Sequence, residues 1–227
     1  MNASPPTIIA IDGPAASGKG TLARRLAEYY GFAHLDTGGL YRAVGLAVLR
    51  QGGDPADSAQ AIKVAQALDA AQLAGLMADP ALRSEPASDA ASKVAAVPAV
   101  RQALYDFQRR FAAAPPNGAP GAVLDGRDIG TVICPEAPAK LFITASAEVR
   151  ATRRVQELQS RGITAIYAAV LEDMKSRDAR DSQREVAPLK PADDAFLLDT
   201  SLLNADQAFE KAVSFISTKV SALAENG

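Results

Sequence analysis

The sequence is poor in two side chains on which many metal and catalytic sites depend. Its 227 residues include one cysteine, Cys134, and one histidine, His34. A single cysteine excludes an internal disulfide framework, and the two residues together are too few for a cysteine–histidine metal site. Because His34 lies in an apolar segment, we expect it to be structural, which leaves no histidine for a nucleophile triad. We expect Cys134 to be a small packed residue.

An excess of positive charge and long apolar runs are also missing. The 24 Lys and Arg residues are balanced by 26 Asp and Glu residues, giving a net charge of −2, whereas general nucleic-acid binders are usually basic. No apolar run approaches the about 20 residues of a membrane span. Met1–Thr7 lacks the charged start and apolar core of a secretion signal. We therefore expect a cytoplasmic protein without nucleic-acid or membrane partners and, since no apolar interface is obvious, a monomer.

Five short apolar runs are present, and they predict buried parallel strands. They are Ile8–Asp12, Phe32–Asp36, Ala122–Asp125, Lys140–Thr144 and Phe196–Asp199. Helical patterns separate them, such as the spacing of Leu22, Leu26 and Tyr29. Strands that alternate with helices predict an α/β fold. We expect a doubly wound, five-stranded parallel sheet that binds its ligands beyond the carboxyl ends of the strands.

The gap between the second and third strands, at about residues 37–120, is too long for a simple crossover. Most of it is Ala-rich and helix-like, over Ala59–Leu76 and Ser88–Phe111. It predicts a subdomain inserted into a single domain of residues 1–227. The stretch Ala112–Gly121 is rich in Ala, Pro and Gly, and it predicts an exposed linker that returns to the sheet.

The first strand runs into a glycine-punctuated turn, Gly13-Pro14-Ala15-Ala16-Ser17-Gly18-Lys19-Gly20-Thr21. Backbone N–H groups and the N-terminus of the following helix suit phosphate groups, and Lys19 can reach the β- and γ-phosphates of a nucleotide. In the general motif a Ser or Thr follows the lysine directly. Here Gly20 intervenes, and Thr21 supplies the hydroxyl. We predict a phosphate-binding loop, or P-loop.

Two further polar stretches follow predicted strands at the same edge of the sheet. Asp36–Arg42 contains two glycines and then Arg42, and Asp125–Asp128 begins with a strand-terminal carboxylate. A carboxylate in that position is usual near a phosphate-bound Mg²⁺ ion. Surface turns with salt bridges are the alternative interpretation. The shared position beside the P-loop favours a function.

Arginine dominates the stretch Lys175–Arg184, and another basic cluster, from Arg150 to Arg161, precedes it. In a helix, Arg177, Arg180 and Arg184 share one face. A solvated, ion-paired helix is the alternative, but guanidinium groups gathered on one face suit bound phosphate. Together with the P-loop they indicate phosphoryl transfer, which needs positioning, cations and Mg²⁺. A phosphate acceptor needs no general base. A hydroxyl acceptor could use Asp128 or Asp36, and the residues leave this choice open.

The chain resembles the bacterial cytidylate kinases, of the P-loop nucleoside monophosphate kinase group, over nearly its whole length. The similar stretches are Ile11–Thr21, Asp36–Arg42, Ala90–Ala96, Asp125–Val132, Arg177–Arg184 and Val186–Ala192. The resemblance implies transfer of the γ-phosphoryl group of ATP to CMP or dCMP, with Mg²⁺, and a mobile lid at about residues 153–180. Thr37 stands where many relatives have serine, and Ala78–Arg83 replaces β-hairpin sequence of longer bacterial members. Another small P-loop kinase, acting on UMP, AMP or a shikimate-type acceptor, is the alternative.

The resemblance also implies roles for individual residues. The catalytic residues would be Lys19, Arg127, Arg177 and Arg184. ATP would be bound by Gly13, Pro14, Ala15, Ala16, Ser17, Gly18, Lys19, Gly20 and Thr21, with Arg154 and Arg180 from the lid. The metal would be held by Thr21 and by Asp125, directly or through water. The CMP phosphate would be gripped by Arg42, Arg127 and Arg184, the cytosine read by Thr37, Arg101 and Asp128, and the ribose contacted by Arg177 and Asp181. Tyr41 would also bind the substrate.

Overall fold

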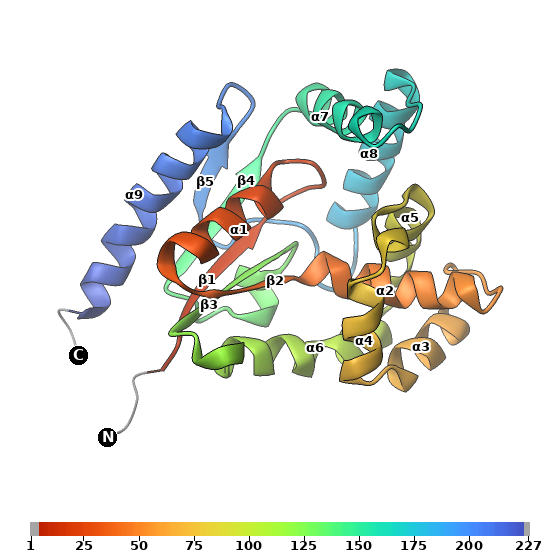
Figure 1. Cartoon of the computed structure of the whole chain (residues 1–227), viewed down its shortest axis with the longest axis horizontal. Coiled ribbons are helices and arrows are strands. Elements are labelled where there is room, and N and C mark those ends of the chain that lie inside the picture. The colour runs from red at the N-terminus through yellow and green to blue at the C-terminus, as the bar shows by residue number, and fades with distance from the viewer. Residues whose placement is uncertain (1–4, 225–227) are drawn as a thin grey trace. The chain divides into compact units, whose positions relative to one another are not determined.

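The computed structural model describes residues 5–224, which form two compact units (Figure 1). The core unit contains the residues up to Leu35 and those from Phe111 onward, and the insert unit is Asp36–Arg110. Each unit is built around its own buried apolar residues and is described below by itself.

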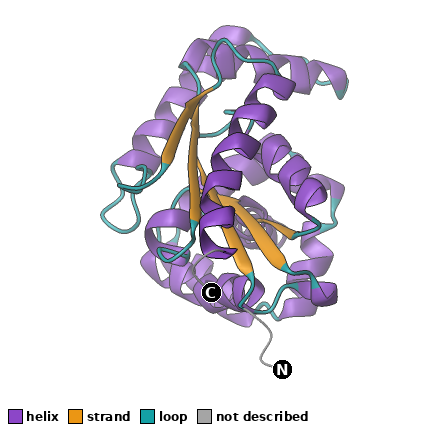
Figure 2. Cartoon of the chain, turned by 90° about the vertical axis from the view of Figure 1, so that its left-hand side faces the viewer, coloured by secondary structure: helices purple, strands orange, loops and turns teal. Residues whose placement is uncertain are grey.

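The core unit contains a five-stranded sheet in the order β2-β3-β1-β4-β5. Its strands are β1 (Thr7–Asp12), β2 (Ala33–Asp36), β3 (Gly121–Gly126), β4 (Ala139–Thr144) and β5 (Phe196–Asp199). The pairs β1–β3, β1–β4 and β4–β5 are parallel, and the strands twist against one another in Figure 2. The predicted sheet is confirmed, with strand ends within one residue of those expected.

The second strand begins at Ala33 and not at Phe32, because the N–H of Phe32 closes the end of the preceding helix. Helix α1 (Lys19–Tyr30) ends at Gly31, whose φ of 67° is left-handed. This turn lets the N–H of Phe32 donate to the carbonyl of Ala27 at 2.8 Å. The bond satisfies a carbonyl that the helix end would otherwise leave without a partner.

One face of the sheet is covered by α1 and α9 (Ala205–Ala224), which lie side by side in Figure 1. Ile9 and Ile11 of β1 are fully buried in the core with Leu26 of α1 and Ile216 of α9. Fully burying a side chain of this size contributes roughly 1.5–3 kcal/mol. This packing fixes β1 and α1, and therefore the loop that joins them.

A helical hairpin, α7 (Ala147–Ser160) and α8 (Tyr167–Ser182), completes the chemically important part of the core unit. Ser146 caps the start of α7 by accepting a hydrogen bond from the N–H of Val149. The two helices carry both arginine clusters seen in the sequence.

The regular elements of the insert unit over residues 37–110, all of which the structure describes, are helices. Its helices are α2 (Thr37–Arg50), α3 (Ser58–Ala67), α4 (Ala70–Met77), the 3₁₀ turn η1 (Pro80–Arg83), α5 (Glu85–Val94) and α6 (Pro98–Ala113). Helices α2 and α5 pack closely at Gly45, where a Cβ atom would lie 2.7 Å from the Cβ of Ala90.

The exposed linker is shorter at both ends than the predicted stretch Ala112–Gly121. Ala112 and Ala113 belong to α6, and Ala112 is buried. At the other end, Gly121 is already the first residue of β3 and is also buried. The two end residues of the stretch, Ala112 and Gly121, are buried in the fold. Because the whole stretch is rich in Ala, Pro and Gly, its composition does not distinguish these buried ends from the exposed middle. The expected burial of Cys134 is confirmed.

Candidate functional site

The loop between β1 and α1 has the backbone of an anion cradle. Gly13 has a φ of 151°, and a Cβ atom there would lie 2.0 Å from the carbonyl oxygen of Ile143. Gly18 occupies the N-cap of α1 with a φ of 90° and offers no side chain to cover the first N–H groups of the helix. Those groups, with the partial positive charge of the helix end, remain available to a bound anion.

Two side chains of this loop fit a phosphate ligand. The amine of Lys19 is folded back to the carbonyl of Pro14 at 3.3 Å. The Oγ atom of Ser17 is buried and has no hydrogen-bond partner within the part of the chain that is described. Buried hydroxyl groups are normally satisfied, so a ligand oxygen is a fitting partner for Ser17.

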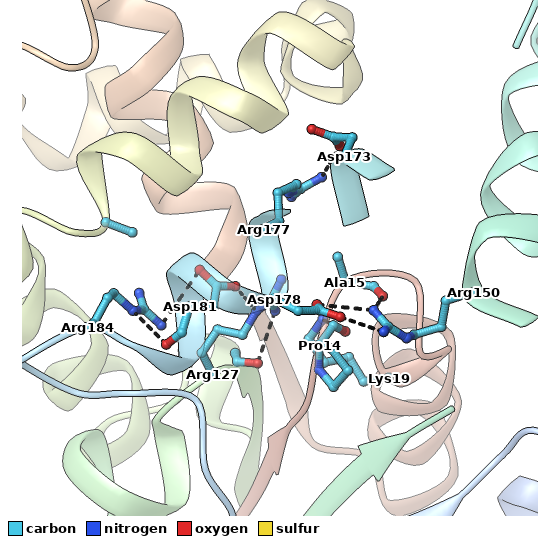
Figure 3. Close-up of polar contacts among 12 residues, drawn as sticks. Pro14, Ala15, Lys19, Arg127, Arg150, Asp173, Arg177, Asp178, Asp181 and Arg184 are labelled. Carbon is cyan, nitrogen blue, oxygen red and sulfur yellow. Dashed lines mark hydrogen bonds and ion pairs between the residues drawn. The ribbon is translucent and has the colours of Figure 1, made fainter. Parts of the chain in front are cut away.

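Two predicted arginines of the core unit, Arg127 and Arg184, contact one buried carboxylate, Asp181 of α8 (Figure 3). The Nε atom of Arg127 donates to Asp181 Oδ2 at 3.0 Å, and Arg184 donates to the carbonyl of Asp181 at 3.2 Å and lies 3.9 Å from its Oδ1. Burial acts most strongly on Asp181 and by itself would raise its pKa. The charges of Arg127, Arg184 and Arg177 oppose burial, and the pKa of Asp181 is lowered.

Arg177 also lies 3.9 Å from Asp173, which is half exposed. Guanidinium groups gathered at partly buried positions are suited to bidentate contact with a phosphate anion. The arginines come from separate elements, the loop after β3 and the end of α8, which the fold brings together.

Helix α7 is tied to the P-loop by two arginines to which the sequence interpretation gave no individual role. Arg150 is buried and donates to the carbonyls of Ala145 at 2.9 Å and Ala15 at 3.3 Å, and it also pairs with Asp178 of α8 (Figure 3). Arg153 donates to the carbonyls of Ser17 at 3.5 Å and Thr200 at 2.7 Å. In the sequence, the only indication of a role for Arg150 and Arg153 was their place in the basic cluster from Arg150 to Arg161. Of the two predicted lid residues, Arg154 pairs with Glu157 on its own helix at 2.8 Å, and Arg180 lies half-buried near the end of α8.

A cavity of about 280 Å³ opens beside the P-loop within the core unit. Its wall includes Thr21 and Leu22 of α1, Arg153 of α7, Thr200 after β5, and Ala208 of α9. The mixture of an apolar wall with a few polar groups is typical of small-molecule sites. Sequence reasoning missed the segment between β5 and α9, because nothing in its composition distinguishes it from an ordinary loop.

The predicted metal residues lie on the core unit at the P-loop. Asp125 is buried and paired with His34 at 2.8 Å, and its Oδ1 lies 3.9 Å from where a Cβ atom of Gly20 would be. Among the described residues, no group of three or more His, Cys, Asp and Glu side chains is placed to hold a metal ion. The hydroxyl of Thr21 and the carboxylate of Asp125 are hard oxygen ligands of the kind that Mg²⁺ uses together with nucleotide phosphates.

Asp128 is buried in the loop after β3 of the core unit, and the remaining predicted substrate residues belong to the insert unit. Arg42 pairs with Asp36, which also caps α2 by accepting from the N–H of Gly39 at 3.1 Å. Thr37, at the start of α2, is buried. Arg101 of α6 is buried too, and its guanidinium carbon lies 5.4 Å from the centre of the Tyr41 ring. The pairs Asp36–Arg42 and Tyr41–Arg101 thus position three of this unit's predicted substrate residues, Arg42, Tyr41 and Arg101.

The family can be decided from a match over most of the chain. A model of the family described as cytidylate kinase matches residues 9–218. The chain belongs to the cytidylate kinase family. A cytidylate kinase of Paramagnetospirillum magneticum is 62% identical over 213 residues, which is 94% of this chain and 99% of that relative. One of Rhodospirillum rubrum is 59% identical over 93% of this chain and 98% of its own.

Solved structures support the same fold at low sequence identity. An uncharacterized protein from Eubacterium ventriosum has a TM-score of 0.53 at 18% identity, over 93% of this chain and 98% of its own. A gluconokinase from Sinorhizobium meliloti has a TM-score of 0.50 at 15% identity, over 98% of both chains. As a cytidylate kinase family member the protein is a nucleotide-binding transferase, as the sequence predicted, and nothing favours the alternative small P-loop kinase. No helix of the described residues combines the length and apolar character needed to cross a bilayer.

Proposed function

We propose that the protein transfers the γ-phosphoryl group of ATP to CMP or dCMP, with Mg²⁺, and forms ADP with CDP or dCDP. The observation that carries this proposal is the gathering of Arg127, Arg177 and Arg184 around Asp181 in the unit that also contains the P-loop. A P-loop alone binds one nucleotide. A second group of cations suits a second phosphate, and phosphoryl transfer between two nucleotides needs both.

The donor nucleotide is assigned to the P-loop and the cavity beside it. Residues Gly13 to Thr21 hold the triphosphate through backbone N–H groups, and the amine of Lys19 neutralises the migrating phosphoryl group. The cavity between Leu22 and Ala208 takes the purine, whose flat apolar faces match its wall. Thr21 and Asp125 would hold the Mg²⁺ ion, directly or through water, and the ion would supply positive charge to the phosphate groups.

The acceptor nucleotide is assigned to the arginine cluster and the insert unit. Arg42, Arg127 and Arg184 grip the phosphate of CMP, and Arg177 with Asp181 contacts the ribose. The cytosine is read by Thr37, Arg101 and Asp128, with Tyr41 holding Arg101. The phosphate of CMP is already largely deprotonated at neutral pH, so these residues position the attacking oxygen and no general base is required.

The α7–α8 hairpin, with Arg154 and Arg180, is assigned to a lid that closes over the ATP phosphates. Closure would exclude water and so suppress hydrolysis of ATP. We further propose that the protein works in the cytoplasm as a monomer, with small nucleotides as its only ligands and neither nucleic acid nor membrane as a partner.

Phosphorus NMR tests the proposal by following ATP, CMP and Mg²⁺ with catalytic amounts of protein. We expect ADP and CDP to form in equal amounts. The inorganic phosphate signal should stay near the level that is measured in a sample without protein. Release of inorganic phosphate in place of CDP would refute transfer to a nucleotide. Addition of a chelator should stop the reaction, and excess Mg²⁺ should restore it.

A further inference from the structure

Asp12 is a buried carboxylate at the junction of two loops, and none of the roles assigned so far uses it. It is the last residue of β1, directly before Gly13 of the P-loop, and only 4% of it is exposed. Its Oδ1 accepts a hydrogen bond from the N–H of Ile129 and its Oδ2 one from the N–H of Gly130, both at 2.8 Å. In both bonds the two partners are more than a hundred residues apart in the sequence.

The two N–H groups begin an unusual turn. Ile129–Ile133 forms the π-helical turn η3, which follows directly on the loop that carries Arg127 and Asp128. Turns of this type are rare and are frequent at functional sites. The first N–H groups of a helical turn have no partner inside it. Asp12 supplies that partner from the neighbouring strand.

The fit leaves little freedom at Gly130. A Cβ atom on that residue would lie 3.2 Å from the Cδ of Lys140 and 3.5 Å from Oδ2 of Asp12. The turn is thus held between the carboxylate and the stem of Lys140. On the other side of Asp12, Gly13 is confined more tightly, since a Cβ atom there would lie 2.0 Å from the carbonyl oxygen of Ile143.

A carboxylate in this place is costly for the fold. Burial raises the pKa of Asp12 to about 7, and the charge of Asp128 acts in the same direction, while the N–H groups of Gly130 and Ile129 and the charge of Arg127 lower it. An apolar residue would avoid this penalty but would leave two N–H groups without a partner. A costly buried charge with a specific geometry, in a site, is typical of a functional role.

We propose that Asp12 is a positioning residue that fixes the Arg127–Asp128 loop to the start of the P-loop. It thereby fixes the position of the acceptor residues Arg127 and Asp128 relative to the donor site. The inference rests on the proposed assignment of Arg127 and Asp128 to the acceptor. Asp12 contacts neither nucleotide. It acts through the backbone of Ile129 and Gly130, which follow those two residues directly.

Asp12→Asn tests this role because it keeps the volume and one acceptor atom but turns an NH₂ group toward the second N–H. We expect the KM for CMP to rise about tenfold, equivalent to about 1.4 kcal/mol. The Kd for a non-hydrolysable ATP analogue, from calorimetric titration, should stay within about twofold, since the N–H groups of the P-loop are untouched. Ile9→Ala, in the same strand and fully buried, serves as a control that lowers the melting temperature without touching these bonds.

The variant Arg127→Ala distinguishes a failure of the proposed acceptor site from a failure of the inference about Asp12. If it leaves the KM for CMP unchanged, the acceptor assignment itself is wrong. If Arg127→Ala raises that KM while Asp12→Asn leaves it unchanged, or if Ile9→Ala raises it as much as Asp12→Asn does, the inference about Asp12 is overturned alone.

If Asp12→Asn does not fold, the inference can be tested on the unaltered protein by an NMR titration with pH. The backbone amide signals of Ile129 and Gly130 should shift together with pH, with one inflection near 7. The titratable and charged groups facing Asp12 are Asp128 and Arg127, and Lys140 packs on the turn. The carboxyl carbon signal of Asp12 is followed in the same titration, and amide signals of Ile129 and Gly130 that stay still while this carboxyl signal titrates would refute the link.

Discussion

The pair formed by Asp36 and Arg42 offers a sharp test of how the insert unit prepares its arginine for a phosphate. Asp36 has two separable tasks, since its Oδ1 caps α2 at Gly39 and its Oδ2 pairs with Arg42. A Cβ atom at Gly38 would lie 3.1 Å from the first oxygen and 3.2 Å from the guanidinium. The three residues therefore form one tight arrangement.

The expected effects follow from these contacts. Asp36→Ala loses the cap, worth about 1 kcal/mol, and an ion pair worth at most about 1 kcal/mol, because its side chains are 41% and 25% exposed. Asp36→Asn keeps an oxygen for the cap and should lose less than about 1 kcal/mol. Both variants release Arg42, so both should raise the KM for CMP by about fivefold, which corresponds to about 1 kcal/mol.

Asp79 provides the matched control in the same unit. It also caps a turn, by accepting from the N–H of Ala81 at 2.8 Å, and it also pairs with an arginine, Arg50. Chemical denaturation should show a similar loss of stability for Asp79→Asn and Asp36→Asn, while a coupled assay should show a raised KM for CMP only with the latter. Equal KM values for Asp36→Asn and the unaltered protein would refute the reasoning, as would an equal rise in Asp79→Asn.

Three further predictions concern the core unit. Lys19→Ala should lower kcat by a factor of about 10² or more through lost stabilisation of the transferred group, with an unchanged circular dichroism spectrum; near-normal turnover would contradict the assigned role. Asp128→Ala should reduce the preference for CMP over UMP in kcat/KM, and an unaltered ratio would remove Asp128 from base reading. Because the folded protein holds the proton of Asp12 more tightly than the unfolded chain does, the contribution of this group to the free energy of unfolding should fall as pH rises from about 4 through about 7. The total is at most about 4 kcal/mol, and denaturation series should show this fall in the unaltered protein and not in Asp12→Asn.

Local patterns were sufficient to predict the sheet and the P-loop. A buried parallel strand is a continuous apolar run, so Ile8–Asp12 and Lys140–Thr144 are visible without tertiary information. The glycines of the P-loop are visible for the same reason, since their backbone angles are a local requirement. The helical pattern grouped Arg177, Arg180 and Arg184 on one face, whereas Arg127 and Arg184 were joined only through the family resemblance, because they lie on different elements.

The features missed by the sequence interpretation depend on contacts between distant segments. Asp12 looks like any strand-terminal acid until the N–H groups of Ile129 and Gly130 are brought to it. Arg150 could not be told from its neighbours in a charged helix, because its burial depends on Ala15 and Asp178. The wall of the cavity beside the P-loop is likewise assembled from segments that are distant in the sequence, among them α1, β4, α7 and α9. Periodicity and composition carry no signal for such groupings.

The most direct test of the whole account is the initial rate of ADP formation with ATP, Mg²⁺ and each of CMP, dCMP, UMP and AMP in turn. The account predicts that CMP and dCMP are phosphorylated much faster than UMP and AMP, because Thr37, Arg101 and Asp128 select the cytosine edge. Equal rates with all four nucleotides would contradict it.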